Sequence, residues 1–375
     1  MKKLAIIGSG RMAWIFGREA REMGIESHAF SFDNHCVAKE TVHEHHLVNI
    51  MELDKVLDIC RRLNVDAVVP TTELTVSVAA YVAEKMGLNG IPYEVACVVT
   101  DKYRNRQLCK GIAELRQPAF AELFTLDQLL SLNLSYPLIF KPTSKGGKRG
   151  VVVVREASEL REAFDFAKVS SGEAPVIVEE FIEDGQEYSV ESLSYHGKHY
   201  IIQVTEKMSS GAPHCVELGH HQPADISEEM RAKVEGVISK GLTAIGVDNG
   251  PCHTEIKIVD NQIYLIEFNA RPGGDHIAWP LTMLSTGYPY LKGVIEVAMN
   301  EFKPVDPSEF LSRYAGVYFV TTQSAFLKPL FDHCQDEPWC YWKNEVSKEL
   351  KPLVHNDGYG TNFFIYCSEE GRPVK

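Results

Sequence analysis

The sequence predicts a mixed α/β fold in which an N-terminal parallel sheet precedes a region of antiparallel hairpins. Short apolar segments alternate with amphipathic segments over residues 1 to about 100. Such alternation is typical of a parallel sheet with helices on its faces. Hairpin patterns then occur at residues 136–154 and 255–269. The chain has 375 residues, 45% of them hydrophobic, so it is long enough for two or three domains with cores of their own.

The N-terminal region begins with a strand and a glycine-containing turn. We expect strands at 3–7, 27–31 and 67–70, and helices at 11–23 and 53–63. Gly8 and Gly10 lie at the first strand-to-helix turn, where glycine lets a ligand come close to a helix N-terminus. Together with Asp33 they leave NAD binding as an alternative. A tight turn without a dinucleotide is the preferred interpretation, because a separate nucleotide site is predicted further along the chain.

A basic, glycine-rich loop follows the strand predicted at residues 136–142. Lys141 ends this strand, and residues 143–150 contain Gly146, Gly147 and a third glycine with two lysines and an arginine. Flexible backbone donors and positive charge suit a polyphosphate. The loop is not a Walker A motif, because Gly-Lys-[Ser/Thr] is absent at the required spacing. The structural alternative is a basic surface hairpin.

An apolar strand at residues 176–182 ends in two acids and an aromatic side chain, Glu179, Glu180 and Phe181, followed by Ile182. Backbone groups after such a strand can hydrogen-bond an adenine edge, while a carboxylate holds ribose hydroxyls. Glu179 or Glu187 could supply that carboxylate.

The hairpin predicted over residues 255–269 carries the most informative pattern in the chain. Alternate side chains of a strand share a face, so Glu267, Asn269 and Arg271 point the same way, and Glu255 can oppose Glu267 from the first strand. Two carboxylates and a carboxamide side by side favour Mg²⁺ or Mn²⁺ over zinc. Arg271 adds a charge suited to a transferring phosphoryl group.

Taken in order, these elements resemble the ATP-grasp superfamily over roughly residues 1 to 300. The resemblance implies ATP between two α+β subdomains, with Lys102 and Lys141 on its phosphates. It places adenine beside Glu180, Phe181 and Ile182, with Glu179 or Glu187 on the ribose. It assigns Mg²⁺ (or Mn²⁺) to Glu255, Glu267 and Asn269, and it places Arg271 on the phosphoryl group. In this superfamily ATP phosphorylates a carboxylate, and an amine or another nucleophile attacks the acyl phosphate.

Within the superfamily, residues 205–207 followed by residues 214–223 resemble the L-amino acid ligases. The resemblance implies that Glu217 holds an α-ammonium group and that His220 polarises a carboxylate or accepts a proton from the amine. The leading hypothesis is an ATP-dependent carboxylate–amine ligase. The alternatives are a ligase with another nucleophile, such as one that carboxylates a purine precursor or biotin, and a catalytically silent nucleotide-binding protein.

The predicted domains are an α/β domain that precedes the grasp (1–100), the grasp domain (101–300) and a C-terminal segment (301–375). The grasp domain includes a small lid subdomain at about 118–182. The C-terminal segment is aromatic-rich, and we expect it to complete or pack on the grasp domain.

Composition limits the partners and the location. The net charge of −13 argues against nucleic acid, and small carboxylate and amine substrates fit better. A signal peptide core and a membrane span are both absent from the pattern, so we expect a cytoplasmic protein, with a homodimer left open. The nine scattered cysteines are expected to be reduced thiols. His43, Glu44, His45 and His46 are interpreted as a solvated loop rather than a metal site.

Overall fold

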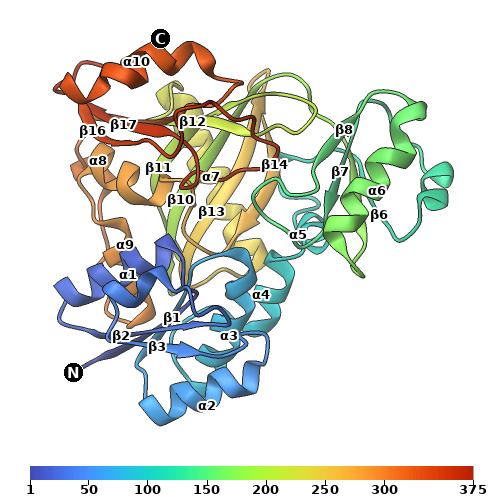
Figure 1. The fold of residues 1–375 in the computed structure, drawn as a ribbon. Helices are drawn as coiled ribbons and strands as arrows, with labels where there is room; N and C mark the ends of the chain where they lie inside the picture. The colour runs from blue at the N-terminus through green and yellow to red at the C-terminus, as the bar shows by residue number, and fades with distance from the viewer. Residues whose placement is uncertain (375) are drawn as a thin grey trace.

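The computed structural model describes residues 1–374, which form three β-sheets and the helices that cover them (Figure 1). The N-terminal sheet is parallel and has the strand order β3-β2-β1-β4. Its strands are β1 Lys3–Ile7, β2 Glu26–Ser31, β3 Glu44–Leu47 and β4 Ala67–Pro70, and its helices are α1 Arg11–Glu22, α2 Leu53–Leu63 and α3 Glu73–Met86. Helix α1 packs on one face, and α2 and α3 pack on the other.

The N-terminal strands and helices confirm the prediction, with one correction. Within residues 43–46, which we interpreted as loop, residues 44–46 belong to the edge strand β3. The side chains of β3 alternate between the two faces of the sheet. His45 and His46 therefore lie on opposite faces and have different neighbours. A run of consecutive polar residues in the sequence does not reveal this difference.

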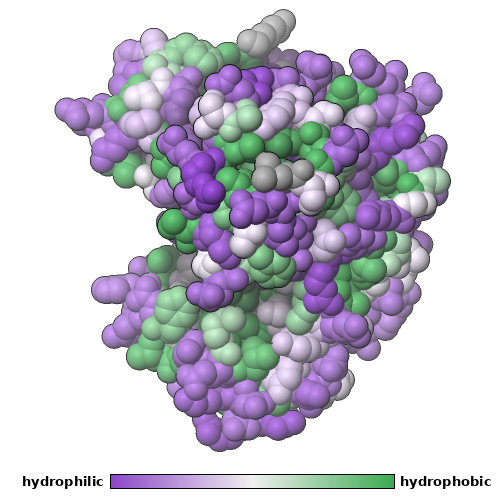
Figure 2. All heavy atoms as spheres, turned by 90° about the vertical axis from the view of Figure 1, so that its right-hand side faces the viewer, coloured by the Kyte–Doolittle hydropathy of each residue, from purple (hydrophilic) through white to green (hydrophobic). Residues whose placement is uncertain are grey.

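A small antiparallel sheet of order β6-β9-β7-β8 projects to one side of the molecule (Figure 1). Its strands are β6 Phe120–Leu123, β7 Leu138–Pro142, β8 Val152–Val154 and β9 Val176–Glu180, and helix α6 Leu160–Ser171 packs on it around Phe140 and Phe164. The predicted hairpin of a strand, a basic loop and a returning strand is therefore β7, the loop at 143–150 and β8. Seen from this side, the surface is largely hydrophilic with scattered hydrophobic residues (Figure 2).

The third sheet has nine strands in the order β16-β17-β15-β12-β11-β10-β13-β14-β5. The strands are β5 Leu115–Arg116, β10 Gln186–Tyr195, β11 Lys198–Ser209, β12 Glu217–Gln222, β13 Gly250–Val259, β14 Gln262–Asn269, β15 Tyr314–Phe319, β16 Cys340–Asn344 and β17 Phe363–Ser368. Helix α7 Glu228–Ile245 covers one face, and α9 Tyr290–Ala298 packs between the other face and α1. Because β15 pairs with β12, residues of the C-terminal segment extend this sheet.

The remaining helices are α4 Tyr93–Val99, α5 Lys102–Leu108, α8 Thr282–Thr286 and α10 Lys328–His333. The side chain of Asp101 caps α5 by accepting a hydrogen bond from the backbone N–H of Arg104. Across residues 1–374, every helix is too short or too polar to span a bilayer.

The hairpin of β13 and β14 has the predicted register. Glu255 pairs directly with Glu267, and the turn residues Asp260 and Asn261 have φ values of 46° and 60°. Two consecutive positive φ values are characteristic of the type I′ turn that joins adjacent antiparallel strands. The turn and the apolar alternation together fix which residues oppose each other.

A buried ion-pair cluster connects the small sheet to the nine-stranded sheet. Arg106 of α5 donates from Nε to the carboxylate of Glu179 on β9 and from Nη1 to the Leu265 carbonyl on β14, the latter at 2.8 Å. Lys141 of β7 lies 2.6 Å from the other carboxylate oxygen of Glu179. Burial alone would raise the pKa of Glu179, but Arg106 and Lys141 lower it to about 2.

We predict that Glu179→Gln destabilises the protein by about 3 to 5 kcal/mol at neutral pH, because Arg106 remains buried without its counter-ion. Urea unfolding measures this loss. The pKa of Glu179 is lowered on folding, so its contribution is complete above the unfolded pKa of 4.5 and is lost as the pH falls toward 2. The difference between the variant and wild type should therefore shrink as the pH falls from 4.5 toward about 2. Glu180→Gln is the matched control, and an equal effect of both variants would contradict the prediction.

Candidate active site

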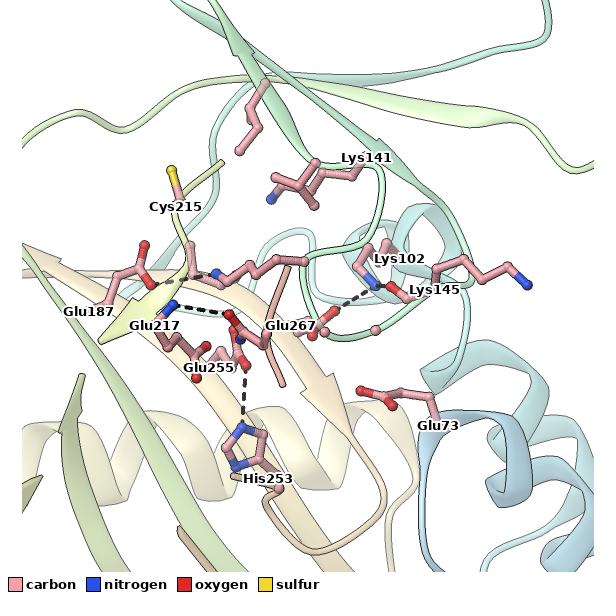
Figure 3. Close-up of a pocket in the computed structure, with 18 of the residues that line it drawn as sticks. Glu73, Lys102, Lys141, Lys145, Glu187, Cys215, Glu217, His253, Glu255 and Glu267 are labelled. Carbon is pink, nitrogen blue, oxygen red and sulfur yellow. Dashed lines mark hydrogen bonds and ion pairs between the residues drawn. The ribbon is translucent and has the colours of Figure 1, made fainter. Parts of the chain in front are cut away.

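A cleft between the small sheet and the nine-stranded sheet collects most of the predicted site residues (Figure 3). Its lining includes Lys102, Lys141, Gly146, Gly147, Glu179, Glu180, Phe181, Ile182, Glu187, Glu217, Glu255, Glu267 and Arg271. Asn269 and His220 are buried and do not line the cleft. These residues come from seven strands and helices and the loops between them, so the fold brings together groups that lie up to 169 positions apart, Lys102 and Arg271 being the extremes.

Glu255 and Glu267 line the predicted metal-binding end of the cleft, and Asn269, the third predicted ligand, is buried on β14 outside this lining. Lys207 lies 3.0 Å from Oε1 of Glu255, and Lys102 lies 3.0 Å from Oε2 of Glu267. These contacts use one oxygen of each carboxylate. Asn269 is 4% exposed, and among residues 1–374 its Nδ2 has no hydrogen-bond partner. Two carboxylates and a carboxamide are hard oxygen donors, so this set fits Mg²⁺ or Mn²⁺.

The charge around Glu255 keeps this carboxylate ionised. Burial would raise the pKa of Glu255, but Lys207 and His253 lower it well below its ordinary value. Burial would lower the pKa of Lys102, yet Glu267 and Glu73 raise it. Carboxylates that stay ionised in a buried site are ready to bind a cation without releasing a proton.

A buried histidine fixes the position of Glu255. His253 Nδ1 bonds the carboxylate of Glu191, whose other oxygen accepts the N–H of Gly273 at 2.9 Å. The Nε2 atom of His253 lies 3.3 Å from Glu255. Burial opposes the charged imidazole, but Glu191 and Glu255 raise the pKa of His253 to about 9. Glu191 and His253 were not predicted, because each needs a partner on another strand to show its role.

The glycine-rich loop lies across the cleft and is held by two hydrogen bonds. Lys102 Nζ donates to the Lys145 carbonyl at 2.8 Å, and the N–H of Asn356 donates to the Gly147 carbonyl at 3.0 Å. A Cβ atom at Gly146 would lie 2.5 Å from the carboxylate of Glu73. A side chain at position 146 would therefore displace the carboxylate of Glu73, which is paired with Arg271.

Arg271 points into the cleft and forms an ion pair with Glu73 at the start of α3. Burial opposes its charge, but Glu73, Glu267 and Glu255 raise its pKa above the ordinary value. Arg271 is therefore a fixed cation beside the predicted metal ligands. The sequence does not reveal Glu73, which lies in a different domain 198 positions away.

The two carboxylates expected near the ribose have different surroundings. Both oxygens of Glu179 are held by Arg106 and Lys141, so Glu179 orients Lys141. Glu187 is partly exposed to the cleft, 3.6 Å from Lys148. Of the two alternatives, Glu187 is the carboxylate available to a ligand. Lys257 donates to the carbonyl of Ile182 at 2.6 Å and so orders the segment expected beside adenine.

The predicted substrate side contains Glu217 and His220 together with two residues that we did not predict. Glu217 lies 2.6 Å from Lys207 and 3.1 Å from Nε2 of His220. Asp275 lines the same part of the cleft and accepts the N–H of Gly358 at 3.1 Å. Burial and the nearby Glu217 raise its pKa. Asn356 accepts the N–H of Glu217 at 3.0 Å, so the C-terminal segment also contributes.

Gly8, one of the glycines that suggested NAD binding as an alternative, occupies a position where the backbone requires glycine. Its φ is +134°, and a Cβ there would lie 2.0 Å from Oγ1 of Thr71. The glycine lets the turn after β1 pack against the residue that follows β4. This packing explains why the turn after β1 needs a glycine at this position.

Comparisons with known proteins identify the type of domain that carries this cleft. Residues 134–279 match the family model described as an ATP-grasp domain. A formate-dependent phosphoribosylglycinamide formyltransferase of Wolinella succinogenes is 25% identical over 274 residues, which cover 72% of this chain and 70% of that protein.

Two solved structures have a similar fold. An L-amino acid ligase from Bacillus licheniformis superposes with a TM-score of 0.81 at 26% identity, over 98% of this chain and 94% of that one. The second structure is a biotin carboxylase domain dimer from Hydrogenobacter thermophilus in complex with MgADP, ADP and bicarbonate. It superposes with a TM-score of 0.75 at 17% identity, over 98% of this chain and 86% of that one. These likenesses confirm the predicted fold and the resemblance on which it rests.

We predict that Lys207→Met destabilises the protein by about 3 to 5 kcal/mol in magnesium-free buffer, because it leaves Glu217 and Glu255 buried without their shared cation. Adding Glu217→Gln should recover part of this loss, since one of the two uncompensated charges is removed. Urea unfolding of the single and double variants measures both effects. Lys198→Met, at an exposed position of the same strand, is the control. Strictly additive losses would contradict the prediction.

Proposed function

This chain contains an ATP-grasp domain and is an ATP-dependent carboxylate–amine ligase, and we propose that its substrates are amino acids. In the proposed reaction ATP activates the carboxylate of one amino acid as an acyl phosphate, and the amine of the second displaces phosphate to form an amide. The observation that carries the proposal is the pair of carboxylates formed by buried Glu217 and half-buried Asp275 on the cleft wall beside the predicted metal ligands.

The residues at the metal end would bind and shield the phosphates. A magnesium ion, when bound, offsets the negative charge that develops on the phosphoryl oxygens. Glu255, Glu267 and Asn269 would hold it, and His253 keeps Glu255 in place. Arg271, Lys102 and Lys141 would bind the transferring group from the remaining sides. The glycine-rich loop, held by Lys102 and Asn356, excludes water that would hydrolyse an acyl phosphate.

The substrate side has the charge expected for an ammonium group. The contact of Glu217 with Lys207 involves Oε1, while Oε2 faces His220. Asp275 receives a backbone hydrogen bond but no cation within salt-bridge distance among residues 1–374. Its raised pKa reflects this uncompensated burial. A substrate ammonium would supply the missing positive charge, and His220 would lie near its amine proton.

A second candidate function follows from the curated relatives. Several are named formate-dependent phosphoribosylglycinamide formyltransferase, so formate and a phosphoribosyl amine are the competing substrates. The amino-acid proposal is favoured because the L-amino acid ligase from Bacillus licheniformis is similar over nearly the whole of both chains, with 26% identity. A homodimer remains a prediction, and a dimer is named for the Hydrogenobacter thermophilus neighbour.

The proposal is tested by measuring ADP and phosphate release from the purified protein with Mg-ATP. Single amino acids are screened first, then pairs, then formate with phosphoribosylglycinamide. Release that requires an amino-acid pair, with the dipeptide found by mass spectrometry, supports the proposal. Release only with formate and phosphoribosylglycinamide would contradict the amino-acid proposal and support the second candidate function. ATP binding without release in any well would favour the silent nucleotide-binding alternative.

We predict that Glu267→Gln and Arg271→Met each reduce substrate-dependent ADP release by at least about 100-fold, because each removes a charge that acts on the transferring phosphoryl group. Circular dichroism should show that both variants are folded. Glu229→Gln, on the exposed surface of α7, is the control and should retain full activity. Activity within a few-fold of wild type in either variant would contradict the assigned roles.

Glu217→Gln should raise the KM of the amine substrate by roughly 10- to 100-fold while the KM for ATP changes little, because a charged hydrogen bond to an ammonium is lost. Steady-state kinetics with each substrate varied in turn provides the measurement. An equal increase in both KM values would point instead to a general disturbance through Lys207.

A further inference from the structure

A second cluster of ligand atoms lies in the N-terminal domain, away from the cleft, where β2 pairs with the edge strand β3 (Figure 1). His28 on β2 is paired in register with Glu44 on β3, and His46 lies two residues further along β3. Because alternate residues of a strand share a face, these three side chains point to the same side of the sheet. The structure brings together two imidazoles and a carboxylate that lie 16 and 18 positions apart.

The distances among the three ligand atoms are close to those of a metal site. Nδ1 of His28 lies 3.1 Å from Nε2 of His46. A carboxylate oxygen of Glu44 lies 3.8 Å from the first of these atoms and 3.7 Å from the second. Two ligands bound at 2.0 to 2.1 Å to a tetrahedral ion are roughly 3.3 Å apart. The histidine pair is therefore near the required spacing, and the exposed side chain of Glu44 needs to move by less than an ångström.

Glu26 adds a second carboxylate behind His28, which two histidines in simple contact with each other would not require. It lies two residues before His28 on the same face, and its carboxylate is 3.0 Å from Nε2 of His28. When this nitrogen carries the proton, the lone pair of His28 lies on Nδ1, facing His46. A carboxylate behind a ligating histidine is the usual outer partner in zinc sites, because it fixes the tautomer and the ring orientation.

The surroundings support a bound cation of moderate affinity. His28 is 2% exposed, and the ring of His46 stacks on Phe30 with the centroids 4.9 Å apart, so both imidazoles are held in place. Glu44 and one side of His46 face solvent, which leaves an entry path and a position for water. Positive charge nearby comes from Lys3, 3.4 Å from Glu26, and from Arg62 on α2. The two glutamates offset these two cations.

We propose that His28, Glu44 and His46 bind one divalent transition-metal ion of the Zn²⁺ class, with water completing the tetrahedron. Two nitrogens and one carboxylate oxygen are a donor set that zinc accepts and that magnesium does not prefer. The site is thus distinct from the oxygen-only set of Glu255, Glu267 and Asn269. The ion would join the edge strand β3 to β2 through side chains as well as through backbone hydrogen bonds.

The test is a titration of the full chain with Co²⁺ in excess Mg²⁺, which occupies the oxygen site and leaves imidazole sites free. Visible absorption reports tetrahedral Co²⁺, and isothermal calorimetry with Zn²⁺ gives the stoichiometry. We expect one Zn²⁺ bound per chain and a tetrahedral Co²⁺ spectrum that Zn²⁺ abolishes. Glu26→Gln should weaken Zn²⁺ binding by roughly 10- to 100-fold.

His46→Gln should abolish both signals, and His45→Gln provides the matched control. His45 lies on the same strand but on the opposite face, where it bonds Ser31 at 2.9 Å, so its loss should leave binding unchanged. Since His28 is buried and its variant could fail to fold, Glu44→Gln at the exposed position serves as the second loss-of-ligand variant. Binding that persists in His46→Gln and Glu44→Gln, or no Zn²⁺ bound by wild type, would overturn the proposal.

Discussion

A single buried arginine fixes how the two walls of the cleft face each other. Arg106 lies on a short helix between the sheets, and it bonds Glu179 on one side and the Leu265 carbonyl on the other. Glu179 in turn holds Lys141. Because all three charged groups are buried, none can rotate away without leaving a partner uncompensated. The positions of the phosphate-side lysine and of the strand β14 that carries Glu267 are thus set by the same three side chains.

The cleft itself is a network of alternating charges. Lys207 lies between Glu217 and Glu255, Lys102 contacts Glu267, and Arg271 contacts Glu73. Each charged group offsets part of the free-energy cost of desolvating its neighbours. The charged groups can therefore be buried together, although each would be costly to bury alone. The network also spans the substrate side and the metal side of the cleft through one lysine. Under the proposed function, substrate and metal would therefore contact a shared set of charged groups.

The sequence predicted those features that depend on local pattern. The register of Glu255 opposite Glu267 follows from strand alternation and the Asp260-Asn261 turn, and the glycine-rich loop follows from composition. The sequence did not predict Arg106, Glu73 or Asn356. Each acts on a residue that is distant along the chain, and none lies in a motif of its own. The interpretation of residues 43–46 as a loop was wrong for a related reason, since the four-residue edge strand β3 is rich in histidine and has little apolar alternation.

The C-terminal extension of the large sheet brings Asn356 to the mouth of the cleft. Its backbone N–H holds the Gly147 carbonyl of the phosphate loop, and its side chain holds the backbone of Glu217. Asn356 thus contacts both the glycine-rich loop and the strand that carries Glu217. Thermodynamic linkage makes any such coupling reciprocal, so a nucleotide that favours the closed loop would tighten binding of the proposed second substrate by the same factor by which that substrate tightens binding of the nucleotide. Retention of a reactive intermediate would then be a property of the C-terminal segment as much as of the loop that covers it.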